Sequence, residues 1–219
     1  MKLFALTLLS IVAISHSVQA LEPAYCEPQN FMSKEVDPNN SILRDRAFKL
    51  GQVMIVGGAI GYSRTEKVIE FVENYSDATA EDKYCTWYYN DGNDDASAVF
   101  NHYYVTNPKK LTVTSGPIEY RQVLKDQFAK SKTSFLSCLE KHKILVMGCN
   151  GQMHRGPTVF GMMLSYSGCS SKNSLAIVNH LWGKNGVKSE VRQAIIEEGY
   201  KLGNEDPQAR LRMQKAFTR

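Results

Sequence analysis

The run Ile144-Leu145-Val146-Met147 constrains the fold of this chain more than any other feature of its sequence. Four successive apolar residues without polar alternation are typical of a strand that is buried on both faces of a sheet. A helix is expected soon after this strand, because Pro157 suits a first helical turn and Val159, Met162 and Tyr166 recur at helical spacing. We therefore expect an α/β fold with a central, mainly parallel sheet flanked by helices.

The other expected elements alternate along the chain in the way that such a sheet requires. Strands are expected over residues 53–56, 85–89 and 101–106, and helices over 64–75, 119–141, 174–182 and 188–202. Residues 21–45 contain three prolines and should form an irregular arm, followed by a short helix that ends at Leu50. The expected organisation is a leader over 1–20, an irregular N-terminal arm over 21–50 and one domain over 51–219.

The first twenty residues have the pattern of a secretory signal peptide. Lys2 precedes an apolar run over residues 3–14, and Val18-Gln19-Ala20 forms a small-x-small cleavage pattern. The run is too short for a stable membrane span, although an uncleaved N-terminal anchor is the alternative interpretation. We expect cleavage near Ala20, a periplasmic or secreted mature protein, and no integral membrane span.

The chain contains five cysteines, an odd number for a protein of an oxidising compartment. At least one thiol is therefore left over. If Cys149 is the free one, the remaining four cysteines allow three pairings, of which Cys26–Cys85 with Cys138–Cys169 is our interpretation.

Charge and histidine spacing limit the classes of partner. The formal net charge of +4, part of it from Lys2, is too small to indicate nucleic-acid binding. The five histidines show no metal-ligand spacing, and the acidic turn over 91–95 lacks the twelve-residue pattern of a calcium loop. The sequence therefore predicts neither a metal nor a cofactor.

The segment between the buried strand and the following helix carries the chemistry. It begins with Cys149 and ends with Arg155. A tight strand-to-helix loop can turn its backbone N–H groups inward and form an anion nest at the positive end of a helix. The Arg155 guanidinium can bind two phosphate oxygens, and the same positive environment lowers the pKa of a cysteine thiol. The residues expected to line the cradle are Asn150, Gly151, Gln152, Met153, His154 and Gly156.

This segment resembles the phosphate loop of the Cys-x5-Arg protein tyrosine phosphatase superfamily. The order of helix, buried strand, loop and helix is similar to that of dual-specificity and phytase-like phosphatases, whereas the spacing inside the loop is closer to low-molecular-weight tyrosine phosphatases. The resemblance implies a protein tyrosine phosphatase-like fold, with Cys149 as nucleophile and Arg155 as phosphate ligand. Two positions depart from the family pattern: Gly148 replaces the usual His, and Gly156 replaces a hydroxyl residue, for which Thr158 is the nearby substitute.

The general acid has no match at its usual place. In the family an Asp on an upstream loop protonates the leaving oxygen, but residues 105–120 contain no Asp and only one carboxylate, Glu119. We rank Glu119 first and Asp91 second for this role. We expect Lys109 and Lys110 to attract a polyanionic substrate at the mouth of the site, and a solvated turn is the alternative interpretation of this pair.

Together these features predict an exported cysteine-dependent phosphatase that takes phosphotyrosine, a phosphoinositol such as phytate, or another small phosphoester. Its partner would be a small phosphorylated substrate or a phosphoprotein. One alternative is a non-catalytic module of the same fold that binds phosphate ligands. Another is sulfur transfer through Cys149.

Overall fold

The computed structural model describes residues 22–31, 34–35, 46–51, 53–59, 85–89, 103–106, 116–141, 144–149, 155–183 and 189–218. The expected leader and the expected helix over 64–75 lie outside these residues. The strands are β1 (Lys34–Glu35), β2 (Arg46–Leu50), β3 (Val53–Ala59), β4 (Cys85–Tyr89), β5 (Tyr103–Thr106) and β6 (Ile144–Cys149). The helices are η1 (Ala24–Cys26), η2 (Pro28–Asn30), α2 (Pro117–Lys141), α3 (Arg155–Tyr166), α4 (Ser171–Trp182), α5 (Ser189–Glu205) and α6 (Pro207–Thr218).

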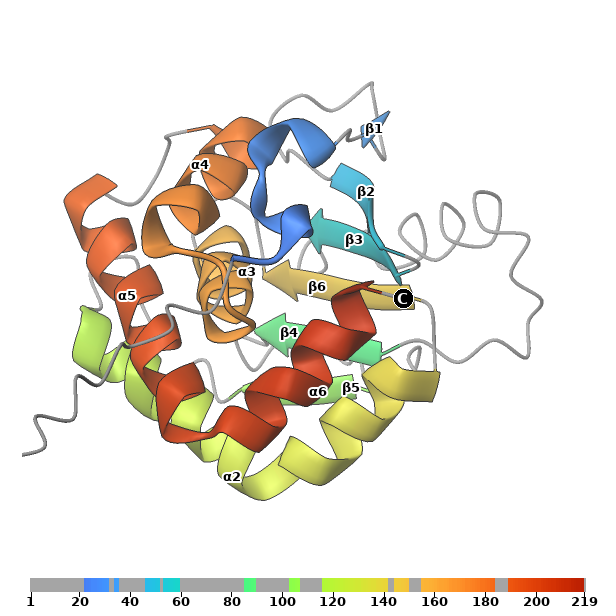
Figure 1. The fold of residues 1–219 in the computed structure, drawn as a ribbon, viewed down its shortest axis with the longest axis vertical. Coiled ribbons are helices and arrows are strands. Elements are labelled where there is room, and N and C mark those ends of the chain that lie inside the picture. The colour runs from blue at the N-terminus through green and yellow to red at the C-terminus, as the bar shows by residue number, and fades with distance from the viewer. Residues whose placement is uncertain are drawn as a thin grey trace, which may run out of the picture.

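The strands form one mixed sheet in the order β1-β2-β3-β6-β4-β5. β3, β6, β4 and β5 run parallel to one another, whereas β1 and β2 add antiparallel strands beside β3 (Figure 1). β6 lies in the middle of the parallel part, and Ile144, Leu145, Val146 and Met147 are all buried. The expected strand over 144–147 is therefore confirmed, as is its burial on both faces.

The prediction of a short helix that ends at Leu50 is wrong, because residues 46–50 form strand β2. Phe48 and Leu50 are buried while Lys49 between them is exposed, which is the period of two of a strand. Leu50 pairs with Val53, so two residues connect β2 to β3, and Gly51 adopts the positive φ of 60° that such a hairpin needs. This hairpin crosses the expected boundary between residues 50 and 51.

The N-terminal arm contributes to the core rather than lying on the surface as an irregular segment. It forms the two short helices η1 and η2, and Cys26 and Phe31 are buried. In Figure 1 the arm, drawn in blue, lies beside α4, with which both short helices are in contact.

Both disulfides differ from the expected pairing. Cys26 is bonded to Cys169 and Cys85 to Cys138, with Cα–Cα distances of 5.3 and 5.8 Å. The arm reaches the turn between α3 and α4, where Cys169 lies, and α2 packs against β4, which begins at Cys85. The expected bonds Cys26–Cys85 and Cys138–Cys169 would require the arm to lie beside β4, and α2 to lie beside the turn between α3 and α4.

Helix α3 is the central helix of the molecule. Every residue from Gly156 to Tyr166 is buried, and the helix packs on β6, β4, α4 and α5. Helix α5 approaches α3 through Gly199 and Gly203, where an added Cβ would collide with backbone atoms of Met162 and Tyr166. The position of α3 is therefore set by direct contact between helix backbones.

Helix α6 is an element that the sequence analysis missed. Its signal was present, because Asp206 precedes Pro207 and the Asp206 carboxylate accepts a hydrogen bond of 3.2 Å from the Ala209 N–H. The helices expected over 119–141, 174–182 and 188–202 are confirmed with slightly different bounds. None of the helices in the described part of the chain combines the length and the apolar character that a membrane crossing requires.

Candidate functional site

Cys149 is the last residue of the central strand β6. Its Cα is paired with that of Ala59 at the end of β3, and the preceding Gly148 is paired with Gly58 on one side and Tyr88 of β4 on the other. The backbone at Cys149 therefore lies at the carboxyl edge of three adjacent parallel strands. Ligands of open parallel sheets bind outside this edge.

Arg155 begins α3, so the expected loop connects the end of β6 to the start of the central helix. The first turn of α3 holds no acidic residue, while Gly156, Pro157 and Thr158 are buried there. The free N–H groups and the dipole of a helix start favour a bound anion. The other expected cradle residues, Asn150, Gly151, Gln152, Met153 and His154, lie outside the described residues.

Glu119 has a structural role that the sequence analysis did not foresee. Helix α2 begins at Pro117, and the Glu119 carboxylate accepts a hydrogen bond of 3.1 Å from the N–H of Gly116, directly before the helix. This is the backward bond of a capping box, which satisfies an N–H group that has no partner within the helix. The side chain is exposed. Asp91, Lys109 and Lys110 lie outside the described part of the chain.

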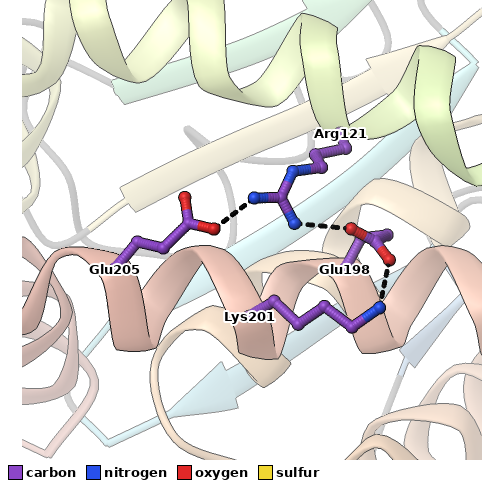
Figure 2. Close-up of polar contacts among 4 residues, drawn as sticks. All are labelled: Arg121, Glu198, Lys201 and Glu205. Atoms are coloured by element: carbon purple, nitrogen blue, oxygen red, sulfur yellow. Dashed lines mark hydrogen bonds and ion pairs between the residues drawn. The ribbon is translucent and has the colours of Figure 1, made fainter.

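An ion-pair network fixes the start of α2 on α5 (Figure 2). The guanidinium of Arg121 lies between two carboxylates of α5: it donates to Glu198 at 2.7 Å and also to Glu205. Lys201 approaches the second oxygen of Glu198 at 2.6 Å. The hydrogen bonds to Glu198 and Glu205 raise the pKa of Arg121. Partial burial opposes ionisation of Glu198, but hydrogen bonds from Lys201 and Arg121 hold its pKa below the ordinary value.

A second polar cluster joins α5 to the end of α4. Arg192 is only 1% exposed and donates hydrogen bonds of 3.2 Å to the Asn179 side chain and to the carbonyl of Gly183, at the end of α4. Burial lowers the pKa of Arg192, and the nearby hydroxyl of Tyr120 partly opposes this effect. Tyr120 is the residue between Glu119 and Arg121, so its buried side chain lies in the first turn of α2.

Sequence reasoning missed these two clusters, although part of the signal was present. Glu198 and Glu205 are seven residues apart, so they lie on one face of α5. Nothing in the sequence shows that Arg121, far away along the chain, lies opposite that face. The ion pairs of Arg121 with Glu198 and Glu205 depend on how α2 and α5 pack, and this packing is set by the whole fold and not by a local sequence pattern.

The described residues contain one group with the geometry of metal ligands: Glu22, Cys26 and Cys169. The two sulfurs are bonded to each other in a disulfide, and the Glu22 carboxylate accepts a hydrogen bond of 2.6 Å from the Ser170 N–H. These atoms are therefore already engaged in bonds that stabilise the fold, and the group is not a metal centre.

Comparison of the chain with protein-family models, with curated proteins and with solved structures gave no match.

Proposed function

We propose that this chain is an exported cysteine-dependent phosphatase with a protein tyrosine phosphatase-like fold. The observation that carries the proposal is the placement of Cys149 and Arg155 on the two sides of one loop. Cys149 ends the central buried strand, and Arg155 begins the buried central helix. The Cys-x5-Arg spacing of the sequence thus falls on a strand end and a helix start, which is where an anion nest requires it.

The proposed reaction uses only residues of this chain. The thiolate of Cys149 attacks the phosphorus of a phosphomonoester, an S–P bond forms, and the bond from phosphorus to the leaving oxygen breaks. The leaving oxygen takes a proton from a general acid. Water then attacks the cysteinyl-phosphate and releases inorganic phosphate, which regenerates the thiolate. Arg155 and the loop N–H groups stabilise the negative charge that develops on the equatorial oxygens.

Cysteine pairing is consistent with this role for Cys149. The other four cysteines form the two disulfides, which leaves Cys149 without a cysteine partner in its own chain. The disulfides also favour an oxidising compartment, in agreement with a leader that is cleaved near Ala20. We place the mature protein in the periplasm or outside the cell, with a small phosphorylated compound or a phosphoprotein as its substrate.

A non-catalytic phosphate-binding module is the second candidate, and the hydrogen bond between Glu119 and Gly116 favours it. A carboxylate that caps its own helix is directed at a backbone N–H, whereas a general acid must be directed at the leaving oxygen of the substrate. Gly156, in place of a hydroxyl residue, would also slow release of phosphate from the thiol.

Phosphate release by the mature protein tests the proposal, with phytate, a phosphotyrosine peptide and an aryl phosphate as substrates. We expect turnover that is lost in Cys149→Ser and reduced at least roughly a hundredfold in Arg155→Met, because an oxyanion donor contributes on this scale. Glu119→Gln is the matched variant for the acid, since Gln also completes a capping box but cannot donate a proton to the leaving group.

Each outcome separates the candidates. Turnover that persists in Cys149→Ser contradicts the cysteine mechanism. Tungstate binding that depends on Arg155, without turnover on any substrate, favours the binding module. A rate that is unchanged in Glu119→Gln removes Glu119 as the general acid and leaves Asp91 as the remaining expectation.

A further inference from the structure

Residues 22–31, which we call the strap, are attached to one corner of the molecule. The bonds that attach them join residues separated in the sequence by about two thirds of the chain length. Glu22 accepts a hydrogen bond of 2.6 Å from the Ser170 N–H, at the start of α4. Tyr25 donates one of 2.9 Å to the Ser167 hydroxyl, in the turn between α3 and α4. The strap therefore holds the end of α3 and the beginning of α4 together.

A covalent bond lies beside these two hydrogen bonds. Cys26 is bonded to Cys169, and both residues are 0% exposed. Burial also raises the pKa of Tyr25 to about 12, although its hydrogen bond to Ser167 acts in the opposite direction, so the hydroxyl stays a neutral donor over the physiological range. The hydrogen bond of Tyr25 is thus insensitive to pH near neutrality, and the sulfur pair is the one bond of the strap that responds to a redox change.

The far end of the strap is connected to the first half of α3 by aromatic rings. The carbonyl of Phe31 accepts a hydrogen bond of 3.2 Å from His180 Nε2, and its ring lies 5.6 Å from that of Phe48. Phe48 lies 5.3 Å from Phe160, which is on α3, and Trp182 packs on both Phe48 and Phe160 at 5.8 Å. Phe160 is less than two helical turns from Arg155, so the aromatic cluster connects the strap to the beginning of α3.

We propose that the strap is an oxidation-locked clamp that orders α3 only after the protein has reached an oxidising compartment. Closing the lock joins the sulfurs of Cys26 and Cys169 and releases two protons and two electrons, which pass to a protein disulfide that is reduced to a dithiol. With the lock closed, Phe31 is held against Phe48 and Phe160, and α3 is fixed along its length. The consequence for phosphate binding at Arg155 rests on the proposed function, whereas the ordering of α3 does not.

Burial of the sulfur pair makes the lock a maturation step rather than a reversible switch. A thiol reductant must reach a sulfur atom in line with the S–S bond, and neither Cys26 nor Cys169 is exposed while the strap is docked. In a reducing compartment the bond is absent before docking, so the strap has only its noncovalent contacts.

Hydrogen exchange followed by mass spectrometry tests the clamp in the mature protein. The test variant is Cys26→Ser/Cys169→Ser, and the matched control is Cys85→Ser/Cys138→Ser, which also removes one buried disulfide. Exchange of peptides from residues 156–163 of α3 is compared with exchange of β6 within each variant. We expect the α3-to-β6 ratio to rise roughly tenfold in the test variant and to stay near the wild-type value in the control, because local opening exposes only the segment that has lost its support.

Phe31→Leu is the second variant, for the case in which the test variant does not fold. It keeps both disulfides and shortens the ring that contacts Phe48, so the same ratio should rise, by less than in the disulfide variant. A ratio that is unchanged in both strap variants, or that rises equally in the control, overturns the clamp. Tungstate binding is measured on the same samples: if wild-type protein binds none, the proposed function fails, while the exchange result still decides the clamp.

Discussion

The glycines of α5 support a prediction that tests the packing of the whole helical layer. A Cβ added at Gly199 would lie 2.9 Å from the Cα of Met162 and still closer to its carbonyl oxygen, and one added at Gly203 would lie 3.1 Å from the carbonyl carbon of Tyr166 and closer to its oxygen. Real Cβ atoms essentially never approach a heavy atom within 3.0 Å. Because the obstructing atoms belong to the backbone of α3, no side-chain rotation relieves the clash.

The expected cost follows from two opposing terms. Forcing an extra methyl into a packed core costs typically 1–3 kcal/mol, and about 3 kcal/mol is appropriate where the obstacle is backbone. Alanine regains about 1 kcal/mol over glycine in a helix. Gly199→Ala and Gly203→Ala should therefore each lower the free energy of unfolding by about 2 kcal/mol. For a chain of this size the melting temperature should fall by roughly 4–8 °C.

Gly161→Ala is the matched comparison on the opposing helix. Its added Cβ would lie 2.6 Å from Cδ1 of Ile196, the end of a side chain that can rotate, and 3.1 Å from Cγ2 of Val178. Its net cost should stay below about 1 kcal/mol, since propensity offsets most of the strain. The double variant Gly199→Ala/Gly203→Ala should cost less than the sum of its parts, because one outward shift of α5 relieves both clashes.

Urea unfolding of the three single variants and the double variant measures these differences, with Gln193→Ala as an exposed control on α5. The slope of the unfolding free energy against urea should be unchanged, so that midpoints report stability alone. A Gly199→Ala protein that is as stable as wild type, or less affected than Gly161→Ala, would refute the close approach of the two helix backbones.

Two further predictions concern polar groups. Glu198→Gln should lower the free energy of unfolding at neutral pH by about 1 kcal/mol, because it weakens the ion pairs with Arg121 and Lys201. Since the folded pKa of Glu198 lies below its ordinary value of 4.5, the carboxylate stabilises the fold above that pH and this stabilisation is lost as the pH falls. The free energy of unfolding, measured against pH in the acid range, should therefore fall less steeply in the variant than in the wild type. The buried hydroxyl of Ser174 has no hydrogen-bond partner among the described residues, so Ser174→Ala should be neutral or stabilise the protein by up to about 1 kcal/mol. Ser167→Ala should instead cost about 1–2 kcal/mol, because it removes the hydrogen bond with Tyr25. Thermal unfolding of the two variants compares these effects directly.

The sequence was most informative where one pattern of residues excludes the other types of secondary structure. The apolar run of β6 is too short for a helix and has no polar alternation, and Pro157 fits a first helical turn, so both the strand and α3 were predictable. Residues 46–50 were misassigned because Phe48, Lys49 and Leu50 are compatible with a short amphipathic helix until the turn at Gly51 is recognised as a hairpin.

The disulfide partners could not be predicted from the sequence for a different reason. Each bond joins segments that are far apart along the chain, 143 residues for Cys26–Cys169 and 53 for Cys85–Cys138. Which cysteines meet depends on which helix corner the arm reaches and on where α2 ends relative to β4. The same holds for Arg121, whose partners on α5 are set by helix packing and not by any local pattern.

The sheet register places the Cys85–Cys138 disulfide away from the end of β6. Cys85 is in register with Leu145, four residues before Cys149 on β6, so the two Cα atoms are separated by about 13 Å along the strand direction. Cysteines whose Cα atoms are more than about 7 Å apart cannot be bridged without movement of the backbone. Cys169 follows the far end of α3, a helix of 12 residues and therefore about 18 Å in length. The two disulfides thus stabilise the elements that frame β6 and α3 without approaching the strand end at which the proposed nucleophile lies.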